Sequence, residues 1–368
     1  MSSNRFVSKN DLIWLTNIAT PYRVPVWNVL NSRLNFQLIL LSNSEKNRNW
    51  DHSLLLKNFE YICLNLRPLY LFEDLPLYFN FLKPLKRIKK SDTKVIYIDG
   101  WESLAYSIVA LYAVRKGIRV IFGYRSTKSS HRFNSKFVHK IRIWILSKAD
   151  YIVTAGSSST MEVKAMRIPQ EKIITLFNPV DVNWFHSFAE SHPRQQSLGH
   201  RFIYVGQLID RKNITTIISA FAAIRKKNDT LIIAGDGPLI ESLRKLTLTL
   251  GISESVDFVG NKNQDEIATL YSLNHTLILA STFEVWGLVV NEALASGMHV
   301  VVSDKCGVAE FVRNMKGSYI CSDHKKSIQD SLQKSSQEWS GHIANPEILK
   351  FTPEKFAEGI IELINSFK

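Results

Sequence analysis

The chain has 368 residues, of which 45% are hydrophobic and 21% are charged. This length indicates about two domains, and this composition is typical of a globular protein that buries two hydrophobic cores. No apolar run approaches the roughly 20 residues that a membrane-spanning helix needs, so no transmembrane helix is predicted.

The first residues, MSSNRFVSKNDLIWL, contain no long apolar segment that ends in a small-residue cleavage site, so we expect no secretory signal. The three cysteines, Cys63, Cys306 and Cys321, lack the spacing of metal ligands. An odd number of cysteines fits a reducing compartment. The sequence therefore predicts a cytoplasmic protein with three unreactive thiols.

The net charge of +13 lies in the first half of the chain. Residues 1–180 contain 27 Lys and Arg against 12 Asp and Glu, whereas residues 181–368 contain 19 against 21. Such asymmetry indicates an anionic partner of the first half, which would be a nucleic acid, an anionic membrane or an anionic substrate.

Short apolar runs alternate with helix-like segments along the first half. Strands are predicted at 11–17, 36–42, 94–100, 119–124, 151–156 and 172–181. Helices are predicted after Pro21, which suits a first helical position, at 102–117 with Gly117 as its end, and near 134–148.

The polar, aperiodic segment 184–200 is predicted to be an interdomain linker. Beyond it the alternation restarts, with strands at 202–208, 230–235, 256–260, 276–281 and 299–304, and helices at 213–227, 238–251, 264–273 and 353–367. Alternating strands and helices predict parallel sheets covered by helices on both faces. We therefore predict an α/β fold of two doubly wound, Rossmann-like domains, residues 1–183 and 201–352, with ligands at the carboxyl ends of their strands.

The stretch STFEVWGLVVNEALASG, residues 281–297, contains two acids, Glu284 in a loop and Glu292 in a helix. A strand, a loop and a helix in this order direct backbone N–H groups at an anion, and Gly287 allows close approach of the backbone. Glu292 has the acceptor oxygens to bind the two hydroxyls of a ribose. Its spacing also fits the solvated face of an ordinary helix, and both interpretations stay open.

Three further stretches follow predicted strands. In YVGQLIDRKN, residues 204–213, Arg211 and Lys212 suit a diphosphate, or they belong to a solvated basic turn. IIAGDGPL, residues 232–239, is no dinucleotide fingerprint and indicates a tight turn more than a ligand contact. NPVD, residues 178–181, is consistent with a turn before the linker.

Together these stretches resemble the second half of the family 4 glycosyltransferases, which have the GT-B fold. The matching motifs are GQL…RKN, GDGP, VDFVG and EVWGLVVNEALASGMHV, and the likeness covers about 178–302. Each motif is loose, but four in register are specific.

The resemblance implies a role for each matched position. Glu292 would bind the ribose of a sugar nucleotide and Glu284 the donor sugar, while Lys212 would neutralise the diphosphate, and Glu284 and Lys212 are the catalytic candidates. The remaining donor-site candidates are Gly206, Gln207, Arg211, Gly235, Trp286, Gly287 and Leu288. Gln207 stands where the family usually has an Arg, for which Arg211 could compensate, and Trp286 and His299 replace the commoner Phe and Pro.

The first half offers weaker candidates at the ends of its predicted strands. NIATPYRVPVWNVL resembles the opening of bacterial surface-polysaccharide members of this family. Candidates for acceptor or donor-sugar contact are Arg23, Trp101, Arg125 and Ser126, each equally consistent with a simple loop residue. His131, alone in a loop of Ser, Lys and Arg, is more typical of a solvated side chain than of a base.

Residues 67–94 mix Leu, Tyr and Phe with six Lys and Arg between 83 and 94. A basic, aromatic and amphipathic segment is typical of a membrane surface, although a core helix with a basic exposed face has the same pattern. With the basic first half, this favours a peripheral enzyme on the inner face of the cytoplasmic membrane with a glycan or lipid-linked acceptor.

No Asp-x-Asp pair occurs in the chain. We therefore expect no metal and no other cofactor, with cations and helix N-termini stabilising the leaving nucleoside diphosphate. The resemblance implies a transferase that uses a nucleotide sugar, with UDP-sugar favoured, and retains the anomeric configuration. The alternatives are a nucleotide-sugar 2-epimerase of the same fold, for which the first half has few acids at strand ends, and a basic nucleic-acid-binding protein, for which no known module is visible.

Overall fold

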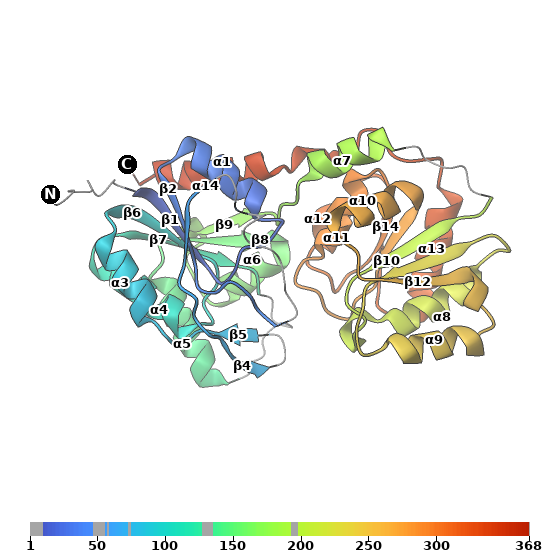
Figure 1. The fold of residues 1–368 in the computed structure, drawn as a ribbon, viewed down its shortest axis with the longest axis horizontal. Coiled ribbons are helices and arrows are strands. Elements are labelled where there is room, and N and C mark those ends of the chain that lie inside the picture. Colours follow the sequence, from blue (N-terminus) through green and yellow to red (C-terminus); the bar gives the residue numbers. More distant parts are fainter. Residues whose placement is uncertain are drawn as a thin grey trace. The chain divides into compact units, whose positions relative to one another are not determined.

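The computed structural model describes residues 10–46, 56, 59–72, 75–126, 135–192 and 198–367 (Figure 1). The chain divides into two compact units. One consists of Met1–Phe177 together with Pro353–Lys368, and the other is Asn178–Thr352. Each unit is a parallel sheet with helices on both faces, which confirms the predicted α/β class with two Rossmann-like domains.

The first unit is built on a seven-stranded parallel sheet in the order β3-β2-β1-β6-β7-β8-β9. Its strands are β1 Asn10–Thr16, β2 Phe36–Leu40, β3 Tyr61–Cys63, β6 Thr93–Ile98, β7 Arg119–Tyr124, β8 Tyr151–Ala155 and β9 Ile173–Leu176. The helices are α1 Val24–Arg33, α3 Leu82–Lys90, α4 Leu104–Arg115, α5 Lys136–Ser147, α6 Gly156–Ala165 and α14 Pro353–Asn365. The order of the strands reverses between β1 and β6, which makes that junction the switch point where such sheets bind ligands.

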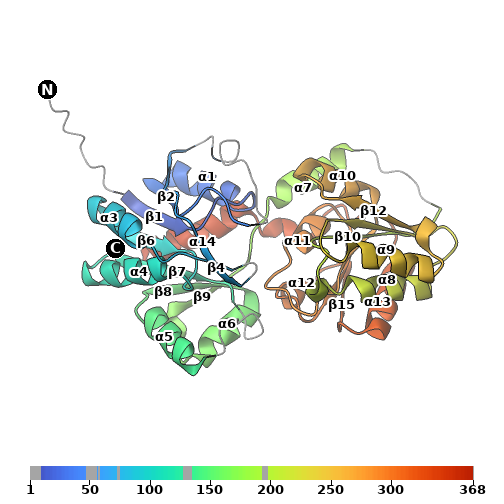
Figure 2. The same ribbon diagram turned by 60° about the horizontal axis from the view of Figure 1, so that its bottom comes forward.

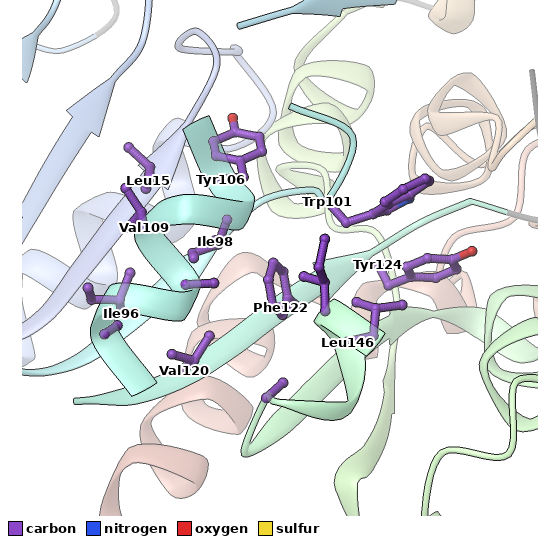
Figure 3. Close-up of a cluster of buried hydrophobic side chains, with 14 of the residues drawn as sticks. Leu15, Ile96, Ile98, Trp101, Tyr106, Val109, Val120, Phe122, Tyr124 and Leu146 are labelled. Carbon is purple, nitrogen blue, oxygen red and sulfur yellow. The ribbon is translucent and has the colours of Figure 1, made fainter. Parts of the chain in front are cut away.

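Helices cover both faces of this sheet. The C-terminal helix α14 lies beside α1 on one face, while α3, α4 and α5 lie on the other, as Figure 1 and Figure 2 both show. Figure 3 shows the core beneath α4, where Val109 faces side chains of the central strands such as Ile98 and Phe122. Central strands that are buried on both faces read as continuous apolar runs, which is why β6 and β7 were visible in the sequence.

The second unit has a six-stranded parallel sheet in the order β12-β11-β10-β13-β14-β15. Its strands are β10 Arg201–Val205, β11 Thr230–Ala234, β12 Val256–Gly260, β13 Thr276–Leu279, β14 His299–Ser303 and β15 Ser318–Cys321. The helices are α7 Val182–Ser191, α8 Ile214–Ile224, α9 Ile240–Thr249, α10 Gln264–Leu273, α11 Leu288–Ala295, α12 Ala309–Val312 and α13 Lys325–Gln337. Here the switch point lies between β10 and β13.

The segment 184–200 is not the interdomain linker that the sequence predicts. Its first part belongs to α7, which Asp181 caps by accepting a hydrogen bond from the Trp184 N–H at 3.0 Å. The helix packs on α10 and α11, so the second unit begins at Asn178 and not at residue 201. Because Trp184, Phe185 and Phe188 are embedded in polar residues, the helical periodicity is weak in the sequence.

Two smaller predictions in the first half are also wrong. Helix α1 starts at Val24 with Pro25 in its first turn, so Pro21 does not open it. Residues 67–94 are not one amphipathic element, because strands β4 Leu69–Phe72 and β5 Leu75–Leu77 form a hairpin ahead of α3. Helix α3 packs against α4 through Pro84 and Ile88 and exposes its basic residues, which matches the alternative of a core helix with a basic face.

A cluster of aromatic rings lies near the amino ends of β10, β13 and β14. The Trp339 ring stacks on His275 at 4.8 Å between centroids and meets His200, His299 and His342 edge-on at 4.8 to 5.8 Å. The His275 Nδ1 accepts the Arg201 N–H at 3.1 Å, which requires a neutral ring. Burial, with a contribution from neighbouring positive charges, lowers the pKa of His200 to about 3 and that of His275 to about 4.

This cluster predicts that the second unit loses stability in mild acid. The unfolded chain binds protons on these histidines below about pH 6.5, whereas the folded unit does not until about pH 4. The free energy of unfolding therefore falls as the pH drops through that window, by about 1.4 kcal/mol per pH unit for each histidine. Denaturant titrations at several pH values should show a shallower fall for His275→Gln. The same substitution at the exposed His324 is the control. If His275→Gln left the dependence of the unfolding free energy on pH unchanged, His275 would not be a source of the acid sensitivity.

Candidate functional site

The loops that follow β10 and β13 meet at the switch point of the second unit. The Thr282 N–H donates to the Arg211 carbonyl at 2.9 Å, and the Asn213 side-chain amide donates to the Ala280 carbonyl at 3.1 Å. Adjacent parallel strands end at the same edge of a sheet, so residues some 70 positions apart in the sequence become neighbours. This edge brings together most of the predicted donor-site residues.

Glu284 lies between two cations from the β10 loop. Its Oε2 forms an ion pair with Arg211 Nη1 at 3.2 Å and another with Lys212 Nζ. The Glu284 and Lys212 side chains are only 16% and 12% exposed, and that of Arg211 is 34% exposed. Two cations that share one carboxylate leave one positive charge in excess, which can neutralise an anionic group.

Glycines let the loops at this edge approach one another closely. Gly235 has φ +146°, and a Cβ there would lie 1.9 Å from the Gly206 carbonyl oxygen. Gly206 itself has φ +149°, and its N–H donates to the Ala234 carbonyl at 2.9 Å. A side chain at Gly235 would push apart the loops after β10 and β11, whereas a Cβ at Gly206 would lie 2.9 Å from the Tyr204 hydroxyl. Both glycines therefore shape the site rather than merely fill a turn.

Helix α11 begins at this edge. Its N-cap is Gly287, with φ +103°, and the helix has no acidic residue in its first turn, where Leu288 is the first residue. The positive end of the helix dipole therefore faces the edge, with no acidic side chain in the helix's own first turn. The Trp286 side chain is buried against Phe311, so only the backbone of this residue is available to a ligand.

Glu292 does not lie on a solvated helix face. Asn291, Ala295 and Ser296, which lie around it at helical spacing, are fully buried, and so is the opposite side of α11. Glu292 is partly buried, and its Oε2 accepts a hydrogen bond from the Tyr271 hydroxyl on α10 at 3.0 Å. Burial raises the pKa of Glu292 to about 7 against the opposing effect of that hydrogen bond. A carboxylate held there at a cost in stability is typical of a functional position.

The remaining donor-site candidate, Gln207, is exposed, and its backbone carbonyl accepts the Tyr204 hydroxyl at 2.8 Å. The loop thus uses this residue through its backbone. Arg211, in the same loop, places a guanidinium at this edge through its ion pair with Glu284.

The candidates of the first unit follow its central strands. Arg23 lies between β1 and α1 and is 4% exposed, while Arg125 follows β7 and forms an ion pair with Asp99 at 2.6 Å. Ser126 donates to Glu102 at 3.4 Å. Arg23 and Arg125 follow β1 and β7, the strands on either side of β6, and therefore lie at the same edge of the sheet. His131 lies outside the described residues.

Trp101 is the exception among these candidates. It is 7% exposed, and the Arg142 guanidinium lies 4.3 Å from the centre of its ring. Its side chain also contributes to the core of the first unit (Figure 3). Trp101 is therefore a packing residue by geometry, which differs both from the predicted ligand contact and from the alternative of a simple loop residue.

Two family models match the chain. Residues 33–184 match Glycosyltransferase Family 4, and residues 192–340 match Glycosyl transferases group 1. The chain belongs to these glycosyltransferases. The two matched regions fall in the first and second structural units, respectively, apart from a few residues at the boundary.

Relatives of this glycosyltransferase include an uncharacterized glycosyltransferase of Methanocaldococcus jannaschii, 27% identical over 56% of each chain. Glycogen synthase of Mycobacterium tuberculosis is 30% identical over 51% of this chain and 45% of its own. The chain thus matches about half the length of these curated relatives. Among solved structures, Anabaena HepE in complex with UDP and glucose superposes with a TM-score of 0.74 at 16% identity, covering 97% of this chain and 100% of that one. This likeness shows that the glycosyltransferase has the GT-B fold.

Two residues of the candidate sites of this glycosyltransferase were not predicted from its sequence. Tyr271, which holds Glu292, lies on a different helix 21 positions away and has no local motif around it. Asp99, which holds Arg125, lies in the strand predicted at 94–100 but was not among the candidates. An acid directly after a buried strand and before a glycine was the available signal for Asp99.

Proposed function

We propose that the protein transfers a hexosyl-type sugar from a nucleoside-diphosphate sugar, with UDP-sugar favoured, to a glycan or lipid-linked acceptor. The observation that carries this proposal is the arrangement at the β10–β13 edge. Glu292 offers a carboxylate for the ribose hydroxyls, and the Arg211, Lys212 and Glu284 cluster lies with the start of α11 at the same edge. The UDP complex of the structurally similar Anabaena protein supports the choice of nucleotide.

The cations supply the electrostatic catalysis in this proposal. As the bond between the sugar C1 and the diphosphate oxygen breaks, negative charge develops on that oxygen. Lys212 and Arg211, together with the dipole of α11, stabilise it there without a metal ion or another cofactor. Glu284 orients the two cations and contacts the donor sugar.

Retention of the anomeric configuration is part of the same proposal. The acceptor oxygen bonds to C1 on the face that the diphosphate leaves, and its proton passes to the leaving phosphate oxygen. Glu284 shares its charge with two cations, which makes it a weak nucleophile, so the protein supplies positioning and charge rather than a covalent intermediate. NMR of the product's anomeric proton would test this step.

A thermal-shift panel tests the donor assignment. UDP-sugars should raise the melting temperature of the full chain, because a ligand that binds only the folded state stabilises it. Uridine and free glucose should raise it less, because they lack the diphosphate. GDP- and ADP-sugars provide the comparison among bases. A panel in which no nucleotide sugar shifts the melting temperature would overturn the proposal, and a sugar epimerised without transfer would favour the 2-epimerase alternative.

We also place the protein peripherally on the cytoplasmic membrane surface, in cell-surface polysaccharide biosynthesis. Among the described residues, no helix has the length and apolar character to cross a bilayer. Helix α5 exposes Phe137, Ile141 and Trp144 at helical spacing, 70%, 38% and 50% accessible. Lys136 and Lys140 flank this stripe. An exposed apolar stripe bordered by cations favours insertion into an anionic lipid surface.

Vesicle sedimentation tests the membrane assignment. The protein should bind vesicles that contain anionic lipid and should bind neutral vesicles weakly. A variant with Phe137→Asp and Trp144→Asp should bind anionic vesicles at least about tenfold less tightly, because it loses buried apolar area and gains negative charge. Leu248→Asp on α9, where Leu248 is 70% exposed, is the matched control. Binding to duplex DNA instead of vesicles would favour the nucleic-acid alternative.

A further inference from the structure

The β1–β6 switch point of the first unit contains a buried charge cluster. Arg23 comes from the loop after β1, Asp99 from the loop after β6 and Arg125 from the loop after β7. These three strands are neighbours in the sheet and end at the same edge. The cluster therefore lies where an open α/β sheet binds its ligand.

The Asp99 carboxylate is already engaged in this cluster. Its Oδ1 pairs with Arg125 Nη2 at 2.6 Å, and its Oδ2 accepts the Thr16 hydroxyl at 3.3 Å. The Asp99 side chain is only 4% exposed. Arg125 and Asp99 thus neutralise each other, and Arg23 is left as an additional positive charge.

Arg23 is buried with hydrogen-bonding capacity to spare. Among the residues that the structure describes, none accepts a hydrogen bond from its Nε or Nη1. The hydroxyl of Thr20, in the same loop, also has no partner there. Burial, reinforced by the nearby Arg125, lowers the pKa of Arg23. Burying a guanidinium without hydrogen-bond partners costs free energy. This cost indicates that Arg23 has a partner that is not among the described residues.

We propose that Arg23 and Arg125 bind an anionic oxygen group, a phosphate or a carboxylate, carried by the acceptor. The planar fork of a guanidinium matches either group with two parallel hydrogen bonds. Thr20 supplies a hydroxyl to the same group, and the start of α1, which has no acidic residue in its first turn, faces the edge with its positive end. This inference rests on the proposed function in assigning the anion to the acceptor; binding of the anion stands independently of it.

A purely structural role for Arg23 is the competing explanation. Its guanidinium lies 5.1 Å from the centre of the Phe356 ring on α14, a cation–π contact within the first unit. In that case substitution would lower the melting temperature and would not change anion binding. The two explanations therefore differ in a measurable ligand affinity.

Calorimetric titration of the full chain with inorganic phosphate, at constant ionic strength, tests the proposal. The parent carries Arg211→Met and Lys212→Met, so that the cations of the second unit do not contribute. We expect saturable binding, weakened at least about tenfold by Arg23→Met or Arg125→Met, a loss of about 1.4 kcal/mol or more. Arg23→Lys should restore part of the affinity. The matched controls are Arg33→Met, at the other end of α1, and Arg119→Met, at the other end of β7, and both should bind phosphate as the parent does.

Acetate and glucose complete the set of probes. Binding of phosphate alone identifies a phosphate group, binding of acetate as well extends the site to carboxylates, and glucose should not bind. Phosphate affinity that is unchanged in both Arg23→Met and Arg125→Met, or absent in the parent, overturns the inference. If Arg23→Met does not fold, the phosphate affinity of Arg125→Met tests the proposal by itself. UDP binding by the wild-type chain tests the proposed function separately, since it depends on the second unit.

Discussion

Glu292→Gln should weaken binding of a UDP-sugar by on the order of tenfold to a hundredfold at pH 8 and raise the melting temperature of the protein. The amide keeps the size of the side chain but loses the charge-assisted acceptors for the ribose hydroxyls. Burial raises the pKa of Glu292 to about 7, above the ordinary value near 4.5. Folding therefore disfavours the ionised carboxylate, which is the form present at pH 8. Replacing it with a neutral amide should stabilise the second unit. Calorimetric binding and thermal unfolding of the same preparation measure the two effects.

The pH dependence of binding provides a second readout for the same residue. Since the carboxylate is the binding form, wild-type affinity for a UDP-sugar should increase about tenfold between roughly pH 6 and pH 8. A UDP-sugar is preferable to UDP here because its diphosphate has no group that titrates in this range. Glu292→Gln should show no such increase.

Glu266→Gln is the matched control for these measurements. Glu266 lies on α10, the helix that carries Tyr271, and it is exposed. This variant should keep the wild-type affinity and its pH dependence. Tight, pH-dependent binding by Glu292→Gln would show that the carboxylate does not hold the nucleotide.

Lys212→Met should lower kcat for sugar transfer or donor hydrolysis by about 10²- to 10³-fold, the usual loss when one stabilising group is removed from a developing charge. The same variant should lose most of the preference for UDP over uridine, because Lys212 contributes to binding only through the diphosphate. Arg211 retains its ion pair with Glu284 at 3.2 Å, so part of the local structure persists. Initial-rate kinetics and paired titrations with UDP and uridine measure both effects.

Lys305→Met controls for the loss of a positive charge near the same edge. Lys305 follows β14, pairs with Asp304 at 3.7 Å and has a side chain that is 52% exposed. Its removal should leave kcat and the UDP preference unchanged. Equal effects of the two lysine substitutions would indicate general electrostatic attraction, and a fully active Lys212→Met would exclude the catalytic assignment.

The sequence predicted the class of fold, and the structure brings most of the donor-site candidates to one edge of the second sheet. Parallel strands buried on both faces produce apolar runs, and helices between them produce a different period, so most elements could be identified without coordinates. It failed where apolar residues are sparse or mixed, as in α7 and in the β4–β5 hairpin. It also did not identify β15 or α13, which complete the second unit.

The local motif Glu284…Glu292, with its glycine and the start of a helix between, is set by the sequence alone. So is the concentration of positive charge in the first half, because both are properties of neighbouring residues or of composition. Tertiary structure decided what these residues touch. It paired Glu292 with Tyr271, Glu284 with Lys212 and Arg125 with Asp99, and it buried the helix face that looked solvated. Such contacts depend on the order of strands in a sheet, and that order arises only when the whole core assembles.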